Sequence, residues 1–169
     1  PITPEAISAM FTQIAAEQPH LALPSDEQIN AAYPGLKGKA RGMGVARDVG
    51  FRMPTVWLAE GHSAVAPVYL YRFDWATPML RLLRLSGAHA TELPFVWGNL
   101  DKVNGAPPFT DADRQASAEM QAYWVNFART GDPNGAGLPA WPRAGDGRYL
   151  AFTVAGPAAK ANLQPAPCA

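Results

Sequence analysis

The segment APVYLYRFD, residues 66–74, limits the possible folds of this chain more than any other stretch. From Val68 to Phe73 it is apolar almost throughout, and Arg72 is its one charged residue. A strand with one solvated face alternates apolar and polar residues, whereas a strand of a parallel sheet that is covered on both faces does not. The segment therefore predicts a strand at 68–73, buried on both sides in an α/β protein.

Helices and turns surround this segment in the sequence. They are indicated by helical spacing of apolar residues, by N-cap residues and by glycine stops. The expected elements are a helix at 4–17, a short helix after Ser25, a glycine-rich loop at 33–44, a helix at 45–63 kinked or interrupted at Pro54, a long helix between Thr110 and Gly131, a strand at 149–154 and an Ala/Pro-rich tail at 155–169. In the long helix, Thr110 and Asp113 have the spacing of a capping box, with Asp in the place usually held by Glu or Gln.

The order of these elements is typical of the last part of an α/β sheet protein. Helices are followed by the buried strand, a loop that carries His89, the long helix and a final strand. Two strands are too few to bury faces as apolar as these, so we expect further strands to lie beside them. The chain does not begin with Met and is expected to be part of a larger α/β domain, incomplete by itself.

The charge balance argues against two classes of partner. The 14 Lys and Arg residues match the 14 Asp and Glu residues, so no net field favours nucleic acid or an anionic membrane. No apolar run reaches the roughly 18 to 20 residues of a membrane-spanning helix.

The single Cys168 cannot form an internal disulfide, and no Cys or His spacing suggests a zinc site. A zinc site of this kind is therefore not expected, and no other metal or organic cofactor is implied.

His89 is the strongest candidate for catalysis among the three histidines. It lies in a loop after the predicted buried strand, and α/β sheets present reactive side chains at the carboxyl ends of their strands. His20 lies in a Pro-rich turn and His62 at the end of a predicted helix, where a structural role is the simpler interpretation. A catalytic histidine most often activates a serine with the help of a carboxylate.

Within the chain, the possible partners of His89 are poor. The segment GHSAV, residues 61–65, resembles the start of a G-x-S-x-G nucleophile elbow, but valine replaces the second glycine and the serine follows a helix. We therefore reject Ser63 as a nucleophile. Asp74 ends the strand that leads to His89, whereas the acid and the histidine of a hydrolase usually follow different strands. Glu92 is three residues after His89 and is expected to anchor the loop through hydrogen bonds. The spacing H-x-x-E is not H-E-x-x-H, so a zinc protease is not supported.

Four segments, in order and spacing, resemble the C-terminal part of the type B carboxylesterases, the family that includes the bacterial para-nitrobenzyl esterases and the cholinesterases. They are PVYLYRFDW, GAHATELPFVWGN, YWVNFARTGDPNGAGLPAWPRA and YLAF. The resemblance extends from Asp48 to Phe152 and is compatible with residues 1–47.

The resemblance implies the last part of an α/β-hydrolase fold and ester hydrolysis by a Ser-Glu-His triad. His89 matches the family's catalytic histidine in G-x-x-H-x-x-E-[LI], and Glu92 matches a glutamate in a buried polar network that supports the site. In the family, the nucleophilic serine and the oxyanion-hole glycines lie well upstream, and the triad acid lies a few residues before the position of Pro1. The chain is thus expected to supply only the general base and to be inactive alone.

The resemblance also implies a division of this part of the domain. The expected regions within the single fragment 1–169 are a helical wall of the active-site cleft at 1–63, the sheet and His89 loop at 64–154, and a tail at 155–169. Phe11, Phe51 and Trp57 are candidates to contact the ester, although core packing explains them equally well. The implied partners are a small-molecule ester and either the N-terminal remainder of the domain or another copy bound through exposed sheet surface.

Two other interpretations are kept. The first is a non-catalytic adhesion protein of the same fold, against which the intact GAHATEL segment around His89 argues. The second is a free-standing binding module, which predicts a monomer that melts cooperatively. A partial domain would instead expose an apolar sheet edge and associate.

Overall fold

The chain forms two compact units, residues 1–58 and residues 59–169. The computed structural model describes residues 9, 12–14, 16–17, 19, 26–82, 90–103, 109–145, 147–161 and 163. The helix expected at 4–17 therefore lies largely outside the described residues, and His20 and His89 lie wholly outside them.

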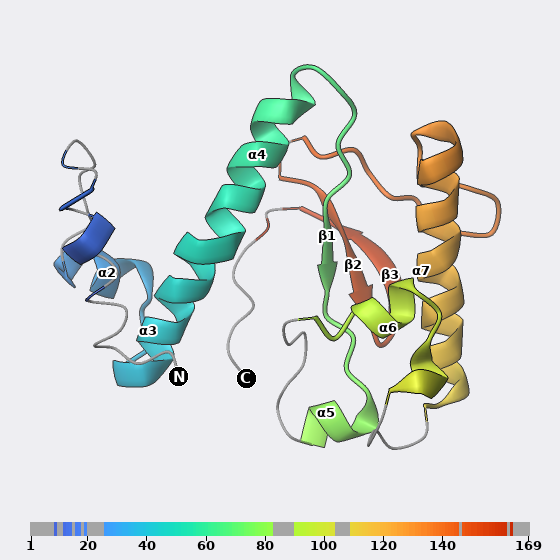
Figure 1. Ribbon diagram of the computed structural model, residues 1–169, viewed down its shortest axis with the longest axis horizontal. Coiled ribbons are helices and arrows are strands. Elements are labelled where there is room, and N and C mark those ends of the chain that lie inside the picture. Colours follow the sequence, from blue (N-terminus) through green and yellow to red (C-terminus); the bar gives the residue numbers. More distant parts are fainter. Residues whose placement is uncertain are drawn as a thin grey trace. The chain divides into compact units, whose positions relative to one another are not determined.

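The described part of the unit 1–58 is helical. Its elements are α2 (Asp26–Ala32), α3 (Gly38–Arg47), the π-helical turn η1 (Asp48–Arg52) and α4 (Met53–Ser63), of which the last continues into the unit 59–169. Figure 1 labels α2, α3 and α4 in order along the chain. Helix α2 confirms the short helix that the sequence predicts after Ser25.

Helix α3 corrects the prediction of a loop at 33–44. The turn is made by Gly35 and Gly38, whose φ angles are +84° and +50°, and the helix begins at the second of them. Farther along, a Cβ added at Gly44 would lie 3.4 Å from Cδ1 of Leu36. This is an ordinary van der Waals distance, so packing does not require glycine here, and the glycine lowers the helix propensity of α3 without breaking the helix.

The predicted interruption at Pro54 is confirmed and takes the form of a π-helical turn. The backbone N–H of Met53 donates to the carbonyl of Asp48, five residues earlier. A proline ring clashes with the carbonyl four residues before it and has no N–H to donate. A wider turn directly before Pro54 therefore accommodates the ring without ending the helix.

The unit 59–169 contains a three-stranded sheet in the order β1-β2-β3 (Figure 1). Its elements after α4 are β1 (Tyr71–Phe73), α5 (Pro78–Leu82), α6 (Leu93–Val96), the 3-10 helix η2 (Leu100–Lys102), α7 (Asp111–Thr130), β2 (Tyr149–Thr153) and β3 (Gly156–Lys160). Strands β1 and β2 are parallel, with Arg72 opposite Ala151. A parallel pair separated in sequence by a helix is the arrangement that the order of elements predicts for an α/β sheet.

Strand β1 corrects the prediction of a long strand buried on both sides. Its regular pairing covers only Tyr71–Phe73, and the Tyr71 side chain is 38% exposed. Strand β2 pairs along one side of β1, and no strand of the described residues pairs along the other. The fully buried strand is β2, in which Tyr149 to Phe152 are all buried.

Strand β3 corrects the expectation of a tail from residue 155. Residues 156–160 pair antiparallel with β2, and Ala151 lies opposite Ala158. The turn between the strands contains Gly156 at a φ of +103°, and the Thr153 hydroxyl donates to the Gly156 carbonyl. Small alanine side chains, which composition alone associates with a tail, here occupy a short edge strand.

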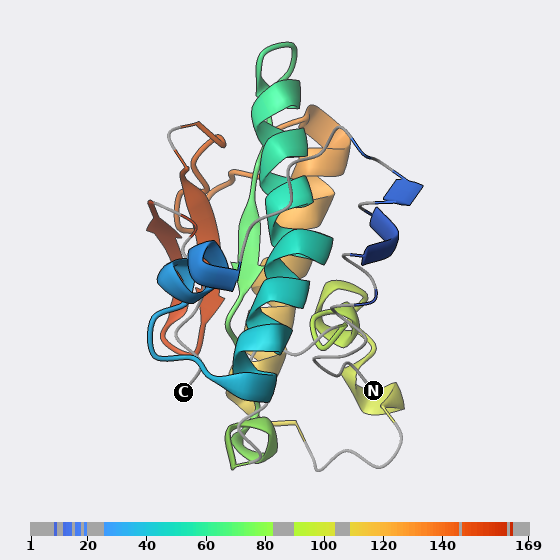
Figure 2. The same cartoon turned by 90° about the vertical axis from the view of Figure 1, so that its left-hand side faces the viewer.

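Helix α7 runs beside the sheet in both views of Figures 1 and 2. Its N-terminus has the predicted capping box, in which Thr110 and Asp113 bond reciprocally, and its C-terminus ends at Gly131 with a φ of +76°. The apolar face of α7 contributes Ala116, Met120 and Tyr123 to the hydrophobic core. The other buried residues of this core are Trp75, Phe95, Leu100, Trp141, Leu150 and Phe152.

The loop after α7 returns to the sheet and is fixed by aromatic side chains. The indole N–H of Trp141 donates to the carbonyl of Leu70 at 2.8 Å, next to β1. The Tyr123 hydroxyl donates to the Pro139 carbonyl at 2.5 Å. These two bonds hold the loop over the entry to β1.

Candidate active site

The carboxyl end of β1 leads directly into a polar pair. Arg72 donates from Nε to Oδ1 of Asp74 at 2.7 Å and from Nη2 to Oδ2 at 2.6 Å. The hydrogen bond with Asp74 is the main reason that the pKa of the Arg72 guanidinium is raised. Asp74 is therefore engaged in a two-pronged ion pair, which agrees with its rejection as a triad acid.

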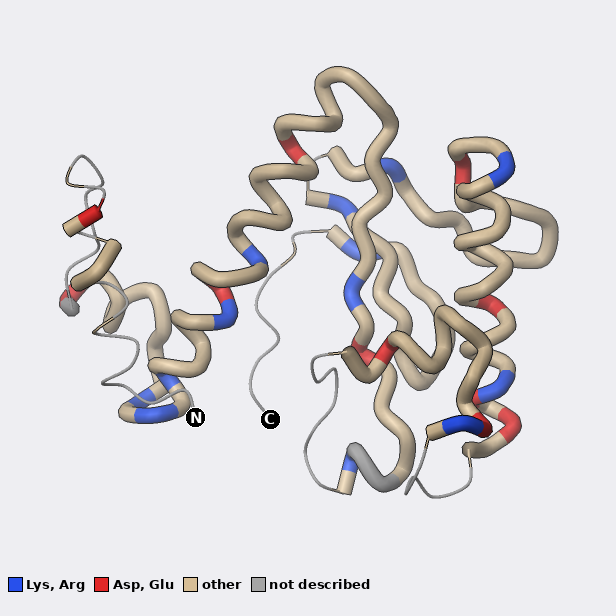
Figure 3. The backbone as a smooth tube through the Cα atoms, in the orientation of Figure 1, with Lys and Arg blue, Asp and Glu red and all other residues tan. Residues whose placement is uncertain are grey.

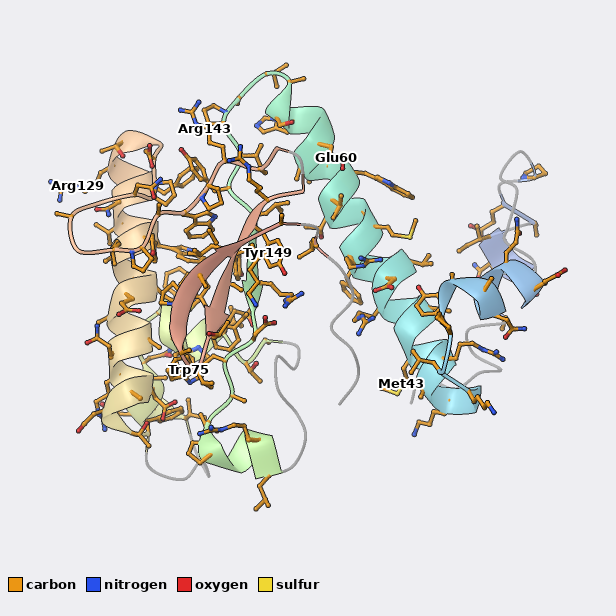
Figure 4. The ribbon with its side chains drawn as sticks, turned by 180° about the vertical axis from the view of Figure 1, so that it is seen from behind. Met43, Glu60, Trp75, Arg129, Arg143 and Tyr149 are labelled. Atoms are coloured by element: carbon orange, nitrogen blue, oxygen red, sulfur yellow. The ribbon has the colours of Figure 1, made fainter. Side chains whose placement is uncertain are left out.

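The next residue, Trp75, connects the end of β1 to the start of α7. Its indole N–H donates to Oδ1 of Asp113 at 2.7 Å, and both side chains are buried. The other carboxylate oxygen of Asp113 accepts from the backbone N–H and the hydroxyl of Thr110, at 2.8 Å and 2.7 Å. Figure 4 places Trp75 beside the sheet and α7. One carboxylate thus caps the helix and anchors the chain that leaves β1.

A second buried bond connects α7 to α6. The Ser117 hydroxyl donates to the Phe95 carbonyl at 2.7 Å, and the Gln121 amide donates to the Ser117 hydroxyl at 3.2 Å. Helix α6 is a single turn with proline in its first turn, so it is too short to be stable without tertiary contacts. Its packing against α7 therefore decides where the segment 90–96 lies.

The described residues resume at Ala90, directly after His89. His89 itself lies outside the described residues, and Ala90 has a φ of +63°. This left-handed conformation costs a residue other than glycine about 1 kcal/mol, and such residues cluster at functional sites. The Ala90 carbonyl accepts from the backbone N–H of Leu93 at 3.3 Å, which closes the turn into α6.

Glu92 lies in this turn and is half-buried. Burial, and after it the negative charge of Glu92, raises the pKa of the Tyr71 phenol on β1. The carboxylate of Glu92 therefore lies within electrostatic reach of the edge strand. Its role in supporting His89 stays a prediction.

Ser63 and His62, the serine and histidine for which the sequence predicts no catalytic role, lie at the C-terminal end of α4. Ser63 is the last residue of α4, and its exposed hydroxyl donates to the Glu60 carbonyl at 2.6 Å. His62 is exposed in the last turn of the same helix. A serine at a helix C-terminus is not the strand-to-helix elbow that a nucleophile requires.

Charged side chains, possible metal ligands and helix length bear on other kinds of site. In the unit 59–169, basic and acidic positions are interspersed along the chain (Figure 3). No three His, Cys, Asp or Glu side chains of the described residues come together as a metal site would require. Of the helices that the structure describes, none is both long and apolar enough to cross a bilayer.

Sequence reasoning missed the roles of Trp75 and Ser117, which form buried hydrogen bonds between α7 and other segments of the chain. The capping-box spacing pointed to Asp113 but could not give its second partner, Trp75, which lies 38 residues earlier in the sequence. Ser117 has no nucleophile-elbow context in the sequence, and nothing in the sequence names the Phe95 carbonyl as its partner. A serine on the apolar face of that helix is the signal that could have indicated a buried acceptor opposite it.

A family model described as the carboxylesterase family matches residues 37–169 of this chain. The chain belongs to the carboxylesterase family. This confirms the resemblance on which the interpretation of the sequence rested.

Relatives in the carboxylesterase family come from bacteria and animals. The chain is 35% identical to the para-nitrobenzyl esterase of Bacillus subtilis over 136 residues, which is 78% of this chain and 27% of that protein. It is 40% identical to the human cocaine esterase over 98 residues, which is 56% of this chain and 17% of that protein. The chain thus spans between about a sixth and a quarter of the length of these relatives.

Solved carboxylesterase structures share the fold of the chain. A Geobacillus stearothermophilus carboxylesterase, EST55, superposes with a TM-score of 0.67 and 29% identity over 91% of this chain and 32% of that one. A PNB esterase superposes with a TM-score of 0.65 and 27% identity over 85% of this chain and 33% of that one. The fold is part of the carboxylesterase α/β-hydrolase fold, as predicted.

Proposed function

We propose that this chain is the C-terminal part of a serine carboxylic ester hydrolase and supplies its general base, His89. The observation that carries the proposal is the carboxylesterase match over residues 37–169, a range that includes the whole GAHATEL segment. The named relatives are esterases, and the substrate class comes from them. The partner is accordingly a small-molecule ester.

In the proposed mechanism, His89 takes the proton of a serine hydroxyl as the oxygen attacks the ester carbonyl. It then gives that proton to the leaving alcohol, which produces an acyl-enzyme. A water molecule repeats the cycle and releases the acid. The serine, the acid that orients the imidazole and the oxyanion-hole donors are assigned to the remaining part of a longer polypeptide, since the chain spans only 17% to 27% of its relatives.

Two further roles follow from the same proposal. Glu92 holds the His89 turn through the polar network that supports the site. The helical region 1–63 is the proposed wall of the cleft, and Phe51 and Trp57, which are 65% and 61% exposed, are its proposed contacts with the acyl or alcohol group. Phe11, the third such candidate, lies outside the described residues.

The test compares variants of the longer protein that contains this chain on p-nitrophenyl esters of graded acyl length. His89→Ala is expected to lower kcat/KM by about a thousandfold or more, because the serine loses its base. His62→Ala is the matched control and should keep full activity, since His62 is exposed at the end of α4. The isolated 169-residue chain should hydrolyse none of the esters.

Either of two results would contradict the proposal. One is a His89→Ala variant that keeps activity close to that of the unmodified protein. The other is hydrolysis by the isolated chain. A longer protein that lacks esterase activity altogether would favour the alternative, a non-catalytic adhesion protein of the same fold.

A further inference from the structure

Two buried hydrogen bonds join one face of α7 to Trp75 and Phe95, the residues that flank the segment 76–94. At one end, the Trp75 indole donates to Asp113 at 2.7 Å. At the other, Ser117 donates to the carbonyl of Phe95 at 2.7 Å. The chain between these two ends, residues 76–94, contains α5, His89 and the first two residues of α6.

Asp113 and Ser117, the two α7 residues that form these bonds, are called the anchors. Their positions on the helix bring Trp75 and Phe95 together. Asp113 and Ser117 are four residues apart, so they lie on one face of the helix and about 6 Å apart along its axis. The rings of Trp75 and Phe95 are correspondingly close, with centroids 6.2 Å apart. A segment whose ends are held side by side behaves as a closed loop, and its interior has far fewer accessible arrangements than a free segment.

The surroundings of the anchors leave little room for movement. Asp113 and Ser117 are both buried, so water does not compete for their bonds. Gln121, which supports the Ser117 hydroxyl, also packs against the main chain after α6, because a Cβ added at Gly98 would lie 2.6 Å from Oε1 of Gln121. Loss of the Trp75 bond would leave the buried Oδ1 of Asp113 without its indole donor. Loss of the Ser117 bond would leave the Phe95 carbonyl with the longer bond from the Gly98 N–H, at 3.3 Å.

We propose that Trp75, Asp113 and Ser117 form a clamp that positions the His89 segment from α7. The inference rests on the proposed function, since it is His89 whose position matters. None of the three side chains is assigned a contact with substrate, so they are positioning residues and act through the main chain of residues 76–94.

The experiment uses Trp75→Phe and Ser117→Ala in the longer protein, because each removes one donor. Ser117→Ala changes the packed volume little, whereas Trp75→Phe also removes part of a buried ring. Both variants should lower kcat by about tenfold, since a displaced base loses transition-state stabilisation, and should leave KM nearly unchanged. Trypsin should cleave after Arg81 and Arg84 faster than in the unmodified protein, because both arginines lie inside the clamped segment. Cleavage sites are identified by mass spectrometry.

Two matched controls separate positioning from general loss of stability. Tyr123→Phe removes another hydroxyl bond from α7, the one to the Pro139 carbonyl, six residues after Ser117 along the helix. It should lower the melting temperature and change neither kcat nor cleavage at the two arginines. Ser63→Ala removes an exposed serine bond to a main-chain carbonyl on α4 and should change nothing measured.

The outcomes distinguish this inference from the proposed function. If His89→Ala is inactive while Trp75→Phe and Ser117→Ala keep the unmodified kcat, the clamp is overturned and the function stands. If Tyr123→Phe lowers kcat as much as they do, the effect is one of stability and the clamp is again overturned. If His89→Ala stays active, the function fails, whereas faster cleavage in the two clamp variants would still support the anchoring of residues 76–94.

Discussion

At the scale of single residues, buried charge in this chain is matched with donors. The carboxylate of Asp48 in the turn η1 is almost fully buried and accepts from the Tyr33 hydroxyl at 2.8 Å. It also accepts from Nε of Arg47 at 3.0 Å and from Nε of Arg52 at 3.1 Å. An isolated charge at this depth would cost several kcal/mol, so these partners are a condition of the fold.

The phenol of Tyr33 should ionise late and make stability depend on alkaline pH. Burial, followed by the hydrogen bond and the charge of Asp48, raises its pKa from 10.0 to about 12. The folded state then holds the proton more tightly than the unfolded state, so this contribution is complete below pH 10 and is lost as the pH rises to about 12. Denaturant unfolding across this interval should show a smaller loss of stability for Tyr33→Phe than for the unmodified chain.

A second variant tests why the pKa of Tyr33 is raised. Asp48→Asn should lower the pKa of Tyr33, but not to its ordinary value, because burial is the largest cause. Tyr123, whose pKa is also raised to about 12 by burial and then by Glu119, serves as the reference and should not respond. An absorbance titration in which Tyr33 ionises at pH 10.0 in the unmodified chain would contradict the assignment.

At the scale of elements, the ends of the helices are defined by local chemistry. Helix α7 begins at the box of Thr110 and Asp113 and ends at Gly131, and both ends agree with the sequence patterns. Helix α3 does not, because three of its ten residues are glycine, which the sequence alone associates with a loop. Elements with a cap and an amphipathic face were therefore predictable, and a glycine-rich helix was not.

Replacing Gly131 or Gly61 by alanine should change the free energy of unfolding in opposite directions. Gly131→Ala should lower the free energy of unfolding by about 1 kcal/mol, because its φ of +76° strains any residue with a Cβ. Gly61→Ala should raise it by up to about 1 kcal/mol, because Gly61 lies within α4 and lacks a positive φ. No atom lies within 4 Å of either added Cβ, so packing does not disturb the comparison.

Denaturant unfolding of the two variants measures this difference. Each serves as the control of the other, since both add the same methyl group to an open position. Equal effects on the free energy of unfolding would contradict the argument that backbone conformation decides their sign.

At the scale of the whole molecule, the chain leaves many large apolar side chains exposed. In the unit 1–58 they are Met43, Phe51, Trp57 and Leu58, and in the unit 59–169 they include Val65, Tyr71, Leu82, Leu93, Trp97, Val125 and Phe127. Trp97, directly after α6, is 73% exposed. Surfaces of this kind are usually covered by another part of a protein or by a partner.

The isolated chain is therefore expected to associate with itself. Sedimentation velocity should give a mass that rises with concentration, because exposed apolar surface and the edge of β1 are available to other copies. Replacing Trp97 and Tyr71 by Lys should reduce this association. A single monomeric species at all concentrations, with one cooperative melting transition, would instead favour a free-standing module.

The sequence by itself determined the family, the α/β class, the long capped helix α7 and the strand β2. Those features depend on neighbours in the chain: a Thr and an Asp three residues apart, a glycine at a helix end, and the motifs PVYLYRFDW and GAHATEL. The tertiary structure alone decided which strand is buried, that residues 156–160 pair with β2, and that Trp75 and Ser117 meet α7 and α6. These features depend on groups far apart in sequence, and no local pattern specifies which buried donor will meet which buried acceptor.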